Sequence, residues 1–164
     1  MAKKDIESLS APEINAYQDK ALAGLLQYLI RNSRFYTDHF REHGIKAGRI
    51  MKIEDLRHIP PTRKEDLQKR GPDFLCVHPR KIIDYMTTSG TSGDPVIYAL
   101  TENDLRRLAY NEYLGFRCAG CTSSEIFQLM TTIDRRFMAG MAYHLGSRKL
   151  RAAMVRVGNG IPEL

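Results

Sequence analysis

The chain has 164 residues, of which 43% are hydrophobic and 27% charged, a composition typical of one soluble globular domain with a sizeable core. No apolar run approaches the roughly 18 residues of a membrane-spanning helix, and the polar N-terminus shows no secretory signal. Three cysteines are too few for a disulfide framework, so the sequence predicts a protein of the reducing cytoplasm.

The formal net charge of +6 is distributed along the chain in isolated pairs of basic residues. We find neither a basic tail nor aromatic residues interleaved with basic ones, as single-strand binders use them. We therefore expect no nucleic-acid partner and no membrane partner. An anionic small ligand, an acidic partner surface or a missing acidic part of the protein would each account for the positive charge.

The N-terminal region is predicted to be helical. Ser10 and Glu13 form a capping-box signature, and apolar residues then recur at three- and four-residue steps over residues 11–31. A second helix is expected over residues 35–43, with Gly44 in the position of a C-terminal cap. Together these segments predict a helical hairpin whose aromatic residues belong to the core.

Another capping box, Thr62 with Glu65, predicts a short helix to about Lys69, which Gly71 and Pro72 would end.

The segment at residues 86–95 reads M-T-T-S-G-T-S-G-D-P and lies between two β-like runs, residues 82–85 and 96–100. Such a loop is too small and too polar to be core. Gly90 and Gly93 allow positive φ angles and a close approach of the backbone to a ligand. Because successive N–H groups in such turns form a concave anion site, the loop indicates polyphosphate binding.

A Walker loop and a nucleophile elbow fit this segment less well, and a plain hairpin turn is an alternative. A Walker loop continues with Gly-Lys-Ser/Thr into a helix, whereas Gly93 is followed by Asp94, a proline and a strand. Ser89 or Ser92 as a nucleophile would require the strand–elbow–helix of Gly-x-Ser-x-Gly, and the following strand argues against it. On composition alone, a Ser/Gly hairpin turn without function stays open.

Strands and helices alternate in the C-terminal half. A helix is predicted from a cap at Thr101 to near Gly115. A strand, a helix and another strand are expected at residues 125–130, 135–150 and 152–157. This order predicts an α/β sheet with right-handed crossovers.

Cys118 and Cys121 have the spacing of redox and metal motifs, but they follow a predicted helix instead of starting one, and a metal site needs two further ligands. His58, His78 and His144 have no visible partner, and we interpret them as structural.

The order Thr-Ser-Gly-Thr-Ser-Gly-x-Pro between strands resembles the phosphate loop of the adenylate-forming acyl-CoA synthetase superfamily. Further stretches favour one branch of it. Residues 29–36, 59–67 and 86–105 resemble, in order and spacing, the N-terminal region of the phenylacetate–CoA ligase family. Residues 152–160 resemble the next strand and turn, so the resemblance covers nearly the whole chain.

This resemblance implies an α/β fold, with a helical hairpin followed by part of the large N-terminal sheet domain of an adenylate-forming ligase. It suggests a helical region at residues 1–70 and an incomplete α/β nucleotide-binding subdomain with the phosphate loop at residues 71–164. In such enzymes a carboxylate attacks the α-phosphate of ATP, and the CoA thiol then displaces AMP from the acyl-AMP. The implied partners are ATP or AMP, an aryl carboxylic acid and CoA, with Mg²⁺ accompanying ATP. The residues that would hold the β- and γ-phosphates are Thr88, Ser89, Gly90, Thr91, Ser92 and Gly93.

The sequence departs from the family in two respects. Asp94 stands where many relatives carry Lys, and its negative charge would weaken ATP binding by about one kcal/mol or more. Members of the family are several hundred residues long, and their downstream Glu, Asp and Lys motifs would lie beyond Leu164. We therefore expect an N-terminal portion that is inactive alone. The alternatives are an adenylating ligase for another acid, or a non-catalytic nucleotide-binding or interaction module that self-associates through uncovered sheet surface.

Overall fold

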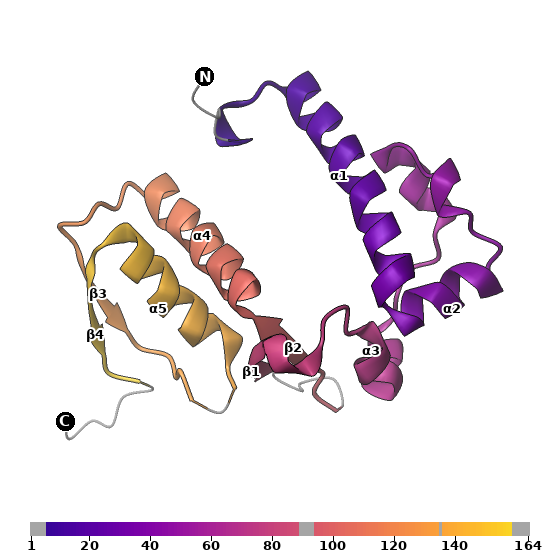
Figure 1. Cartoon of the computed structure of the whole chain (residues 1–164). Helices are drawn as coiled ribbons and strands as arrows, with labels where there is room; N and C mark the ends of the chain where they lie inside the picture. Colours follow the sequence, from indigo (N-terminus) through magenta and orange to yellow (C-terminus); the bar gives the residue numbers. More distant parts are fainter. Residues whose placement is uncertain (1–5, 89–93, 135, 159–164) are drawn as a thin grey trace. The chain divides into compact units, whose positions relative to one another are not determined.

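The structure is a computed structural model that describes residues 6–88, 94–134 and 136–158. It divides into two compact units, Met1–Val77 and His78–Leu164 (Figure 1). The division falls after Val77, whereas the sequence suggests one after residue 70.

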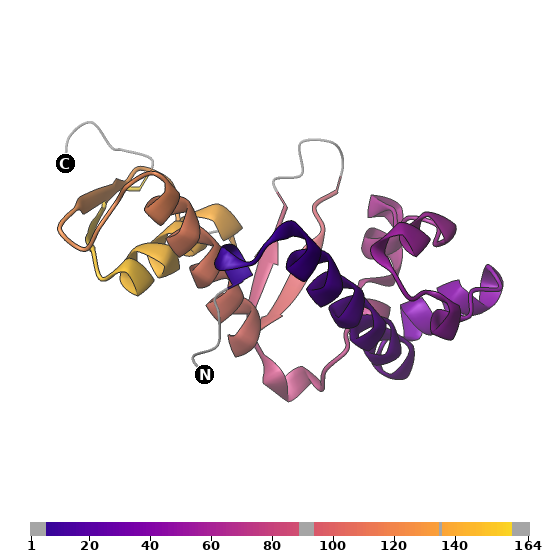
Figure 2. The same ribbon diagram turned by 90° about the horizontal axis from the view of Figure 1, so that it is seen from above.

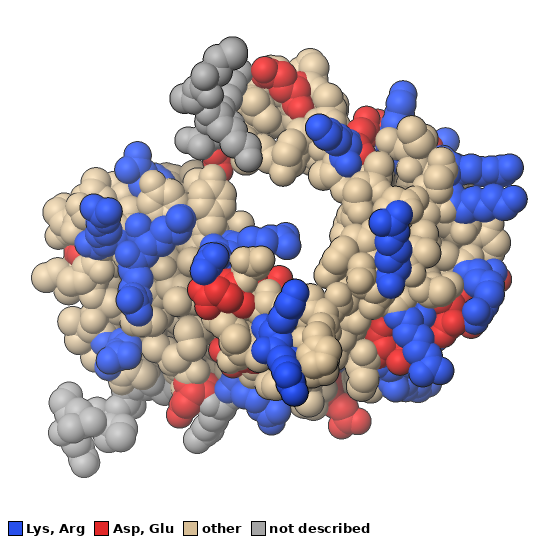
Figure 3. Space-filling model, in the orientation of Figure 1, with Lys and Arg blue, Asp and Glu red and all other residues tan. Residues whose placement is uncertain are grey.

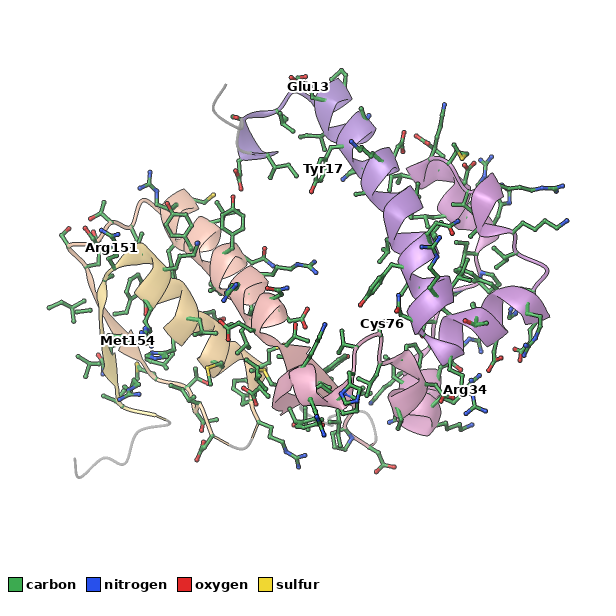
Figure 4. All side chains as sticks on the ribbon, viewed as in Figure 1. Glu13, Tyr17, Arg34, Cys76, Arg151 and Met154 are labelled. Carbon is green, nitrogen blue, oxygen red and sulfur yellow. The ribbon has the colours of Figure 1, made fainter. Side chains whose placement is uncertain are left out.

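The first unit contains α1 (Ala11–Asn32), α2 (Arg34–Glu42) and α3 (Lys64–Arg70). Helix α1 begins at the predicted capping box, where a carboxylate oxygen of Glu13 accepts hydrogen bonds from the backbone N–H and the hydroxyl of Ser10, each at 2.7 Å (Figure 4). Both N-terminal helices are therefore confirmed. Short 3-10 segments complete the unit at Ala47–Arg49, Ile53–His58 and Gly71–Phe74.

A single apolar cluster holds α1, α2 and the first 3-10 segments together. Leu22 and Leu26 of α1 pack with Phe40 of α2, which explains the recurrence of apolar residues along α1. Buried members of this cluster are Leu22, Leu26, Phe40, Ala47 and Ile50, and partly buried side chains packed against them are Ile30, Tyr36, Ile45 and Ile59.

The junction between α1 and α2 is closed by one buried hydroxyl. Ser33 is 1% exposed; its Oγ accepts a hydrogen bond from the Tyr36 N–H at 3.3 Å and donates one to the Asp73 carbonyl at 2.9 Å. The side chain therefore caps α2 and also ties it to the segment after α3.

Replacing Ser33 with alanine removes both bonds and leaves buried polar groups without partners. We expect Ser33→Ala to lower the free energy of unfolding by about 2 kcal/mol, measured by urea denaturation. The exposed cap of α1 provides the control, because Ser10→Ala removes a cap without burying a polar group. Equal losses in the two variants would contradict a special role for the buried hydroxyl.

The start of α3 differs from the prediction. Its N-cap is Arg63, whose N–H donates to Asp66 Oδ2 at 2.8 Å, and not Thr62. The adjacent carboxylate of Asp66 competes with Glu65 for the cap position and shifts the helix start by one residue, while Thr62 Oγ1 lies 3.3 Å from the Tyr36 hydroxyl. The chain also continues past α3 in a 3-10 segment, because Gly71 keeps helical angles.

An ion-pair network joins α2 to the end of α3. Arg70 Nη2 lies 2.7 Å from Asp38 Oδ2 and 2.9 Å from Asp73 Oδ2, and the guanidinium sits 5.2 Å from the centre of the Phe35 ring. The hydrogen bond from Arg70 is the main reason that the pKa of Asp38 lies below its ordinary value of 3.8. The ionised carboxylate therefore favours the folded state.

Because the pKa of Asp38 is lowered in the folded state, acid reduces the stability that this carboxylate contributes. Stability from Asp38 is fully present above about pH 4 and is lost as the pH falls through the folded-state pKa. Asp38→Asn should lower the thermal midpoint at neutral pH and reduce its further fall between roughly pH 5 and pH 3. Thermal melts across this range test the effect, with Glu42→Gln, an exposed carboxylate on the same helix, as control. A parallel pH profile for Asp38→Asn and the unaltered chain would count against it.

The second unit begins with an antiparallel hairpin of β1 (Ile82–Thr87) and β2 (Ile97–Thr101), drawn side by side in Figure 2. Thr87 is opposite Ile97, and a bulge interrupts the register near the start of β1. Both strands agree with the prediction that β segments flank the Thr/Ser/Gly loop.

Helix α4 (Glu102–Cys118), β3 (Ile126–Leu129), α5 (Met138–Leu150) and β4 (Ala153–Arg156) follow. Strands β3 and β4 are parallel. Helices α4 and α5 pack closely where Gly146 of α5 meets Glu112 of α4. A Cβ atom on Gly146 would overlap the Glu112 side chain, so the absence of a side chain at Gly146 permits this contact. Within the described residues the strands form two two-stranded sheets instead of the single sheet that their order predicts.

In the second unit, the end of α4 and the start of α5 were predicted wrongly. Helix α4 passes through Gly115 and ends at Cys118, where Gly120, with a φ of 84°, forms the left-handed C-terminal cap. Helix α5 starts at Met138 and not near residue 135, because Arg136 has a φ of 61°, which no α-helix accommodates.

Candidate functional site

The base of the Thr/Ser/Gly loop is held by a reciprocal pair of hydrogen bonds. The N–H of Thr88 donates to the Val96 carbonyl, and the N–H of Val96 donates to Thr88 Oγ1, each at 3.0 Å. Met86 and Val96, on either side, are each 2% exposed. The loop therefore leaves and re-enters the hairpin at a fixed, buried point.

A third segment supports the same base. The N–H of Thr87 donates to the Arg136 carbonyl at 3.0 Å, and Thr87 forms an isolated parallel bridge with Phe137. The positive φ of Arg136 turns the chain into this position directly before α5. Sequence reasoning missed this support, since no local pattern marks an arginine with a left-handed backbone.

Of the six proposed phosphate-binding residues, only Thr88 is described by the structure. Its backbone N–H is already bonded to Val96, but its hydroxyl accepts a bond there and still has its own hydrogen to donate. Thr88 therefore has a hydroxyl donor, and no amide donor, left for a ligand. Asp94, at the other end of the loop, is exposed. The remaining predicted residues, Ser89, Gly90, Thr91, Ser92 and Gly93, lie outside the described residues.

The described cysteines and histidines are not grouped as metal ligands. Cys118 is an exposed free thiol and Cys121 a partly buried one. Among residues 6–88, 94–134 and 136–158, no three His, Cys, Asp or Glu side chains are grouped as metal ligands. His58 Nε2 accepts from Arg57 Nε, and His78 Nδ1 accepts from the Arg80 N–H, which agrees with local structural roles.

His144 is the most unusual of the histidines. Burial lowers its pKa below 6.5, and the positive charges of Arg156 and Arg148 lower it further. Its buried Nδ1 has no hydrogen-bond partner among the described residues. The ring is therefore held neutral without the second group that a proton relay would need.

Basic side chains are dispersed on the face of the molecule that Figure 3 shows. This distribution agrees with the isolated pairs of basic residues in the sequence. In the part of the chain that the structure describes, none of the helices has the length and apolar character needed to span a bilayer.

Known structures define the class of fold. No family model matches the chain. A crystal structure of 2-hydroxyisobutyryl-CoA ligase in complex with 2-HIB-AMP and CoA aligns with a TM-score of 0.85 and 23% identity, over 94% of this chain and 34% of that protein. An open conformation of that ligase also gives 0.85, at 22% identity over 94% of this chain and 37% of the other. The fold is thus that of part of an adenylate-forming CoA ligase.

Sequence comparison finds relatives among the phenylacetate-coenzyme A ligases. Phenylacetate-coenzyme A ligase of Escherichia coli is 27% identical over 159 residues, which are 96% of this chain and 36% of the relative. That of Thermus thermophilus is 28% identical over 164 residues, 99% of this chain and 37% of the relative. The chain is a relative of the phenylacetate–CoA ligases, as its motifs predict, and spans about a third of their length.

Proposed function

We propose that this chain supplies the ATP phosphate-binding part of an AMP-forming ligase that joins phenylacetate, or another aryl carboxylate, to CoA. The observation that carries the proposal is the hydrogen-bonded closure of Thr88 and Val96 beneath the Thr/Ser/Gly loop, in a relative of phenylacetate–CoA ligases. The residues assigned to the β- and γ-phosphates are Thr88, Ser89, Gly90, Thr91, Ser92 and Gly93.

Hydroxyl and amide donors suit this task, because a hydrogen bond to a charged group is worth roughly 1.5–3 kcal/mol. Such donors accelerate the formation of acyl-AMP only if they bind the charge that develops on the leaving pyrophosphate better than the charge of bound ATP. The hydrogen-bonded hairpin beneath the loop matters for this reason, since donors that are already oriented do not reorganise during the reaction. Asp94 is exposed at the end of the loop, and its carboxylate would reduce ATP affinity in an orientation that faces the phosphates.

Mg²⁺ is expected to arrive with ATP. Magnesium is commonly held by one or two carboxylates together with substrate phosphates. The described residues include no group of three His, Cys, Asp or Glu ligands, so Mg²⁺ would be held largely by the phosphates of ATP, and we assign no step to it.

ATP titration by calorimetry tests the phosphate assignment. In the variant carrying Thr91→Val and Ser92→Ala, we expect ATP affinity to fall about tenfold or more, because two hydroxyl donors are lost. Ser123→Ala, an exposed serine elsewhere in the same unit, is the control and should bind like the unaltered chain. Unchanged affinity in the double variant would refute the assignment.

We also propose that these 164 residues do not complete the reaction alone. The support is that the relatives are nearly three times as long as the aligned region. In an ATP–pyrophosphate exchange assay with phenylacetate, the chain should show no exchange above background. Robust exchange would show that it carries a complete adenylating site. A panel of acids in the same assay would then separate phenylacetate from other carboxylates.

A second candidate function is that of an interaction module. Ile126 and Val155 are 72% and 51% exposed, and they lie on the face of β3 and β4 opposite Phe127 and Met154. Large apolar side chains on an open sheet face favour association. A concentration-dependent elution volume in size-exclusion chromatography that Ile126→Asp abolishes would support this function, and a constant monomer would reject it.

A further inference from the structure

A pocket of about 350 Å³ lies in the first unit, where α2 ends and the following 3-10 segments turn back. The phosphate loop belongs to the second unit, so this pocket is a separate feature. Its lining residues are His43, Gly44, Ile45, Lys46, Arg49, Ile50, Asp55 and His58.

The backbone around this pocket is fixed by the helix end and by the core. Gly44 has a φ of 64°, and its N–H donates to the Arg41 carbonyl at 3.2 Å. The next N–H, of Ile45, donates to the Phe40 carbonyl at 2.8 Å, which completes a Schellman motif. Ile50 is buried in the apolar cluster, and Ile45 packs against it. The pocket is therefore formed before any ligand arrives.

Its charge is mainly positive. Lys46 and Arg49 are exposed, and neither has an ion-pair partner among the described residues. The one carboxylate, Asp55, accepts hydrogen bonds through Oδ2 from the N–H groups of Met51 and Lys52, at 2.9 and 3.0 Å. These two bonds are the main cause of its lowered pKa, so Asp55 is ionised but has one oxygen already occupied. Two cations and one partly engaged anion thus line the pocket.

Two imidazoles add oriented polar groups. His43 Nδ1 donates to the His39 carbonyl at 2.8 Å, which fixes the plane of the ring. His58 Nε2 accepts from Arg57 Nε at 3.3 Å, which leaves Nδ1 to carry the ring hydrogen. His58 therefore offers a donor alongside the ammonium and the guanidinium.

We propose that this pocket binds a small soluble phosphate or pyrophosphate anion. Lys46 and Arg49 both line the cavity, and side chains of these types suit the charge and hydrogen-bonding geometry of phosphate oxygens. The small, concave shape favours a compact anion over an extended nucleic acid or a membrane surface, which would need a longer basic stripe. This site is independent of the ATP site proposed above.

Titration of the ¹⁵N-labelled chain with sodium pyrophosphate distinguishes the two sites by residue. We expect the amide signals of Gly44, Lys46 and Arg49 to shift and saturate, with a Kd of about 1 mM or lower. In the variant carrying Lys46→Gln and Arg49→Gln, this Kd should rise about tenfold or more. Lys52→Gln removes one positive charge from a neighbour that does not line the pocket and should change the Kd less than twofold.

Three results would overturn the proposal: no saturation of these signals, equal shifts with sodium chloride at the same ionic strength, or equal weakening in Lys52→Gln and in the double variant. The first would show that the pocket has no phosphate affinity, and the other two that only general charge screening is seen. The signals of Thr88 and Val96 report the ATP site in the same spectra, so failure of one proposal is visible apart from failure of the other.

Discussion

Replacing Gly140 with alanine is expected to destabilise the second unit by about 3 kcal/mol. A Cβ atom at Gly140 would overlap the carbonyl oxygen of Thr132 and would lie 2.7 Å from its carbonyl carbon and 3.3 Å from the Cα atom of Ile133. These atoms belong to the backbone, so no side-chain rotation can relieve the overlap. Helix α5 or the preceding loop must move instead.

That movement should reach the base of the Thr/Ser/Gly loop. Gly140 is in the first turn of α5, three residues after Phe137, which pairs with Thr87 at the base of the loop. We expect Gly140→Ala to weaken ATP binding as well as stability, measured by urea denaturation and by calorimetry. Gly115→Ala in α4 is the matched control, because a Cβ atom there meets nothing within 4 Å. In a helix interior, that change should stabilise the unit by up to about 1 kcal/mol. Equal behaviour of the two variants would contradict the packing described here.

The starts of α1 and α4 could be predicted because each depends on residues three positions apart, whereas the same kind of signature placed the start of α3 one residue too early. The Thr101 cap of α4 is an example, since Asp104 Oδ2 accepts from the Thr101 N–H at 2.9 Å, as the sequence pattern predicts. The end of α4 could not be predicted from Gly115, because glycine is tolerated inside a helix and only the positive φ of Gly120 ends it. Likewise, nothing local marks the left-handed backbone of Arg136 that delays the start of α5.

The candidate site was predictable only in part. The two strands around the Thr/Ser/Gly loop follow from their apolar pattern, and both are present. The support from Arg136 to Thr87 joins segments far apart in sequence, so no periodicity reveals it. The basic pocket was missed for a similar reason, because Lys46, Arg49 and His58 are brought together by 3-10 turns that have no extended repeat.

Thr88→Val should have the largest effect on nucleotide binding of any single change at a described residue. The substitution keeps the side-chain volume but removes the acceptor for the Val96 N–H, a group on a residue that is 2% exposed. It also removes the one donor that Thr88 has left for phosphate. We expect the free energy of unfolding to fall by about 1–2 kcal/mol and ATP affinity to fall about tenfold or more.

The conservative variant separates these two effects. Thr88→Ser keeps the hydroxyl, so it should retain both the bond from Val96 and most of the ATP affinity, while losing only the packing of one methyl group. Calorimetric titration of ATP at a temperature where all variants are folded removes the contribution of unfolding. If Thr88→Val then bound ATP as tightly as Thr88→Ser, the hydroxyl would serve the hairpin alone, and Thr88 would no longer belong to the proposed phosphate-binding residues. A loss confined to Thr88→Val would instead show that a hydroxyl held at the hairpin base is required for nucleotide binding.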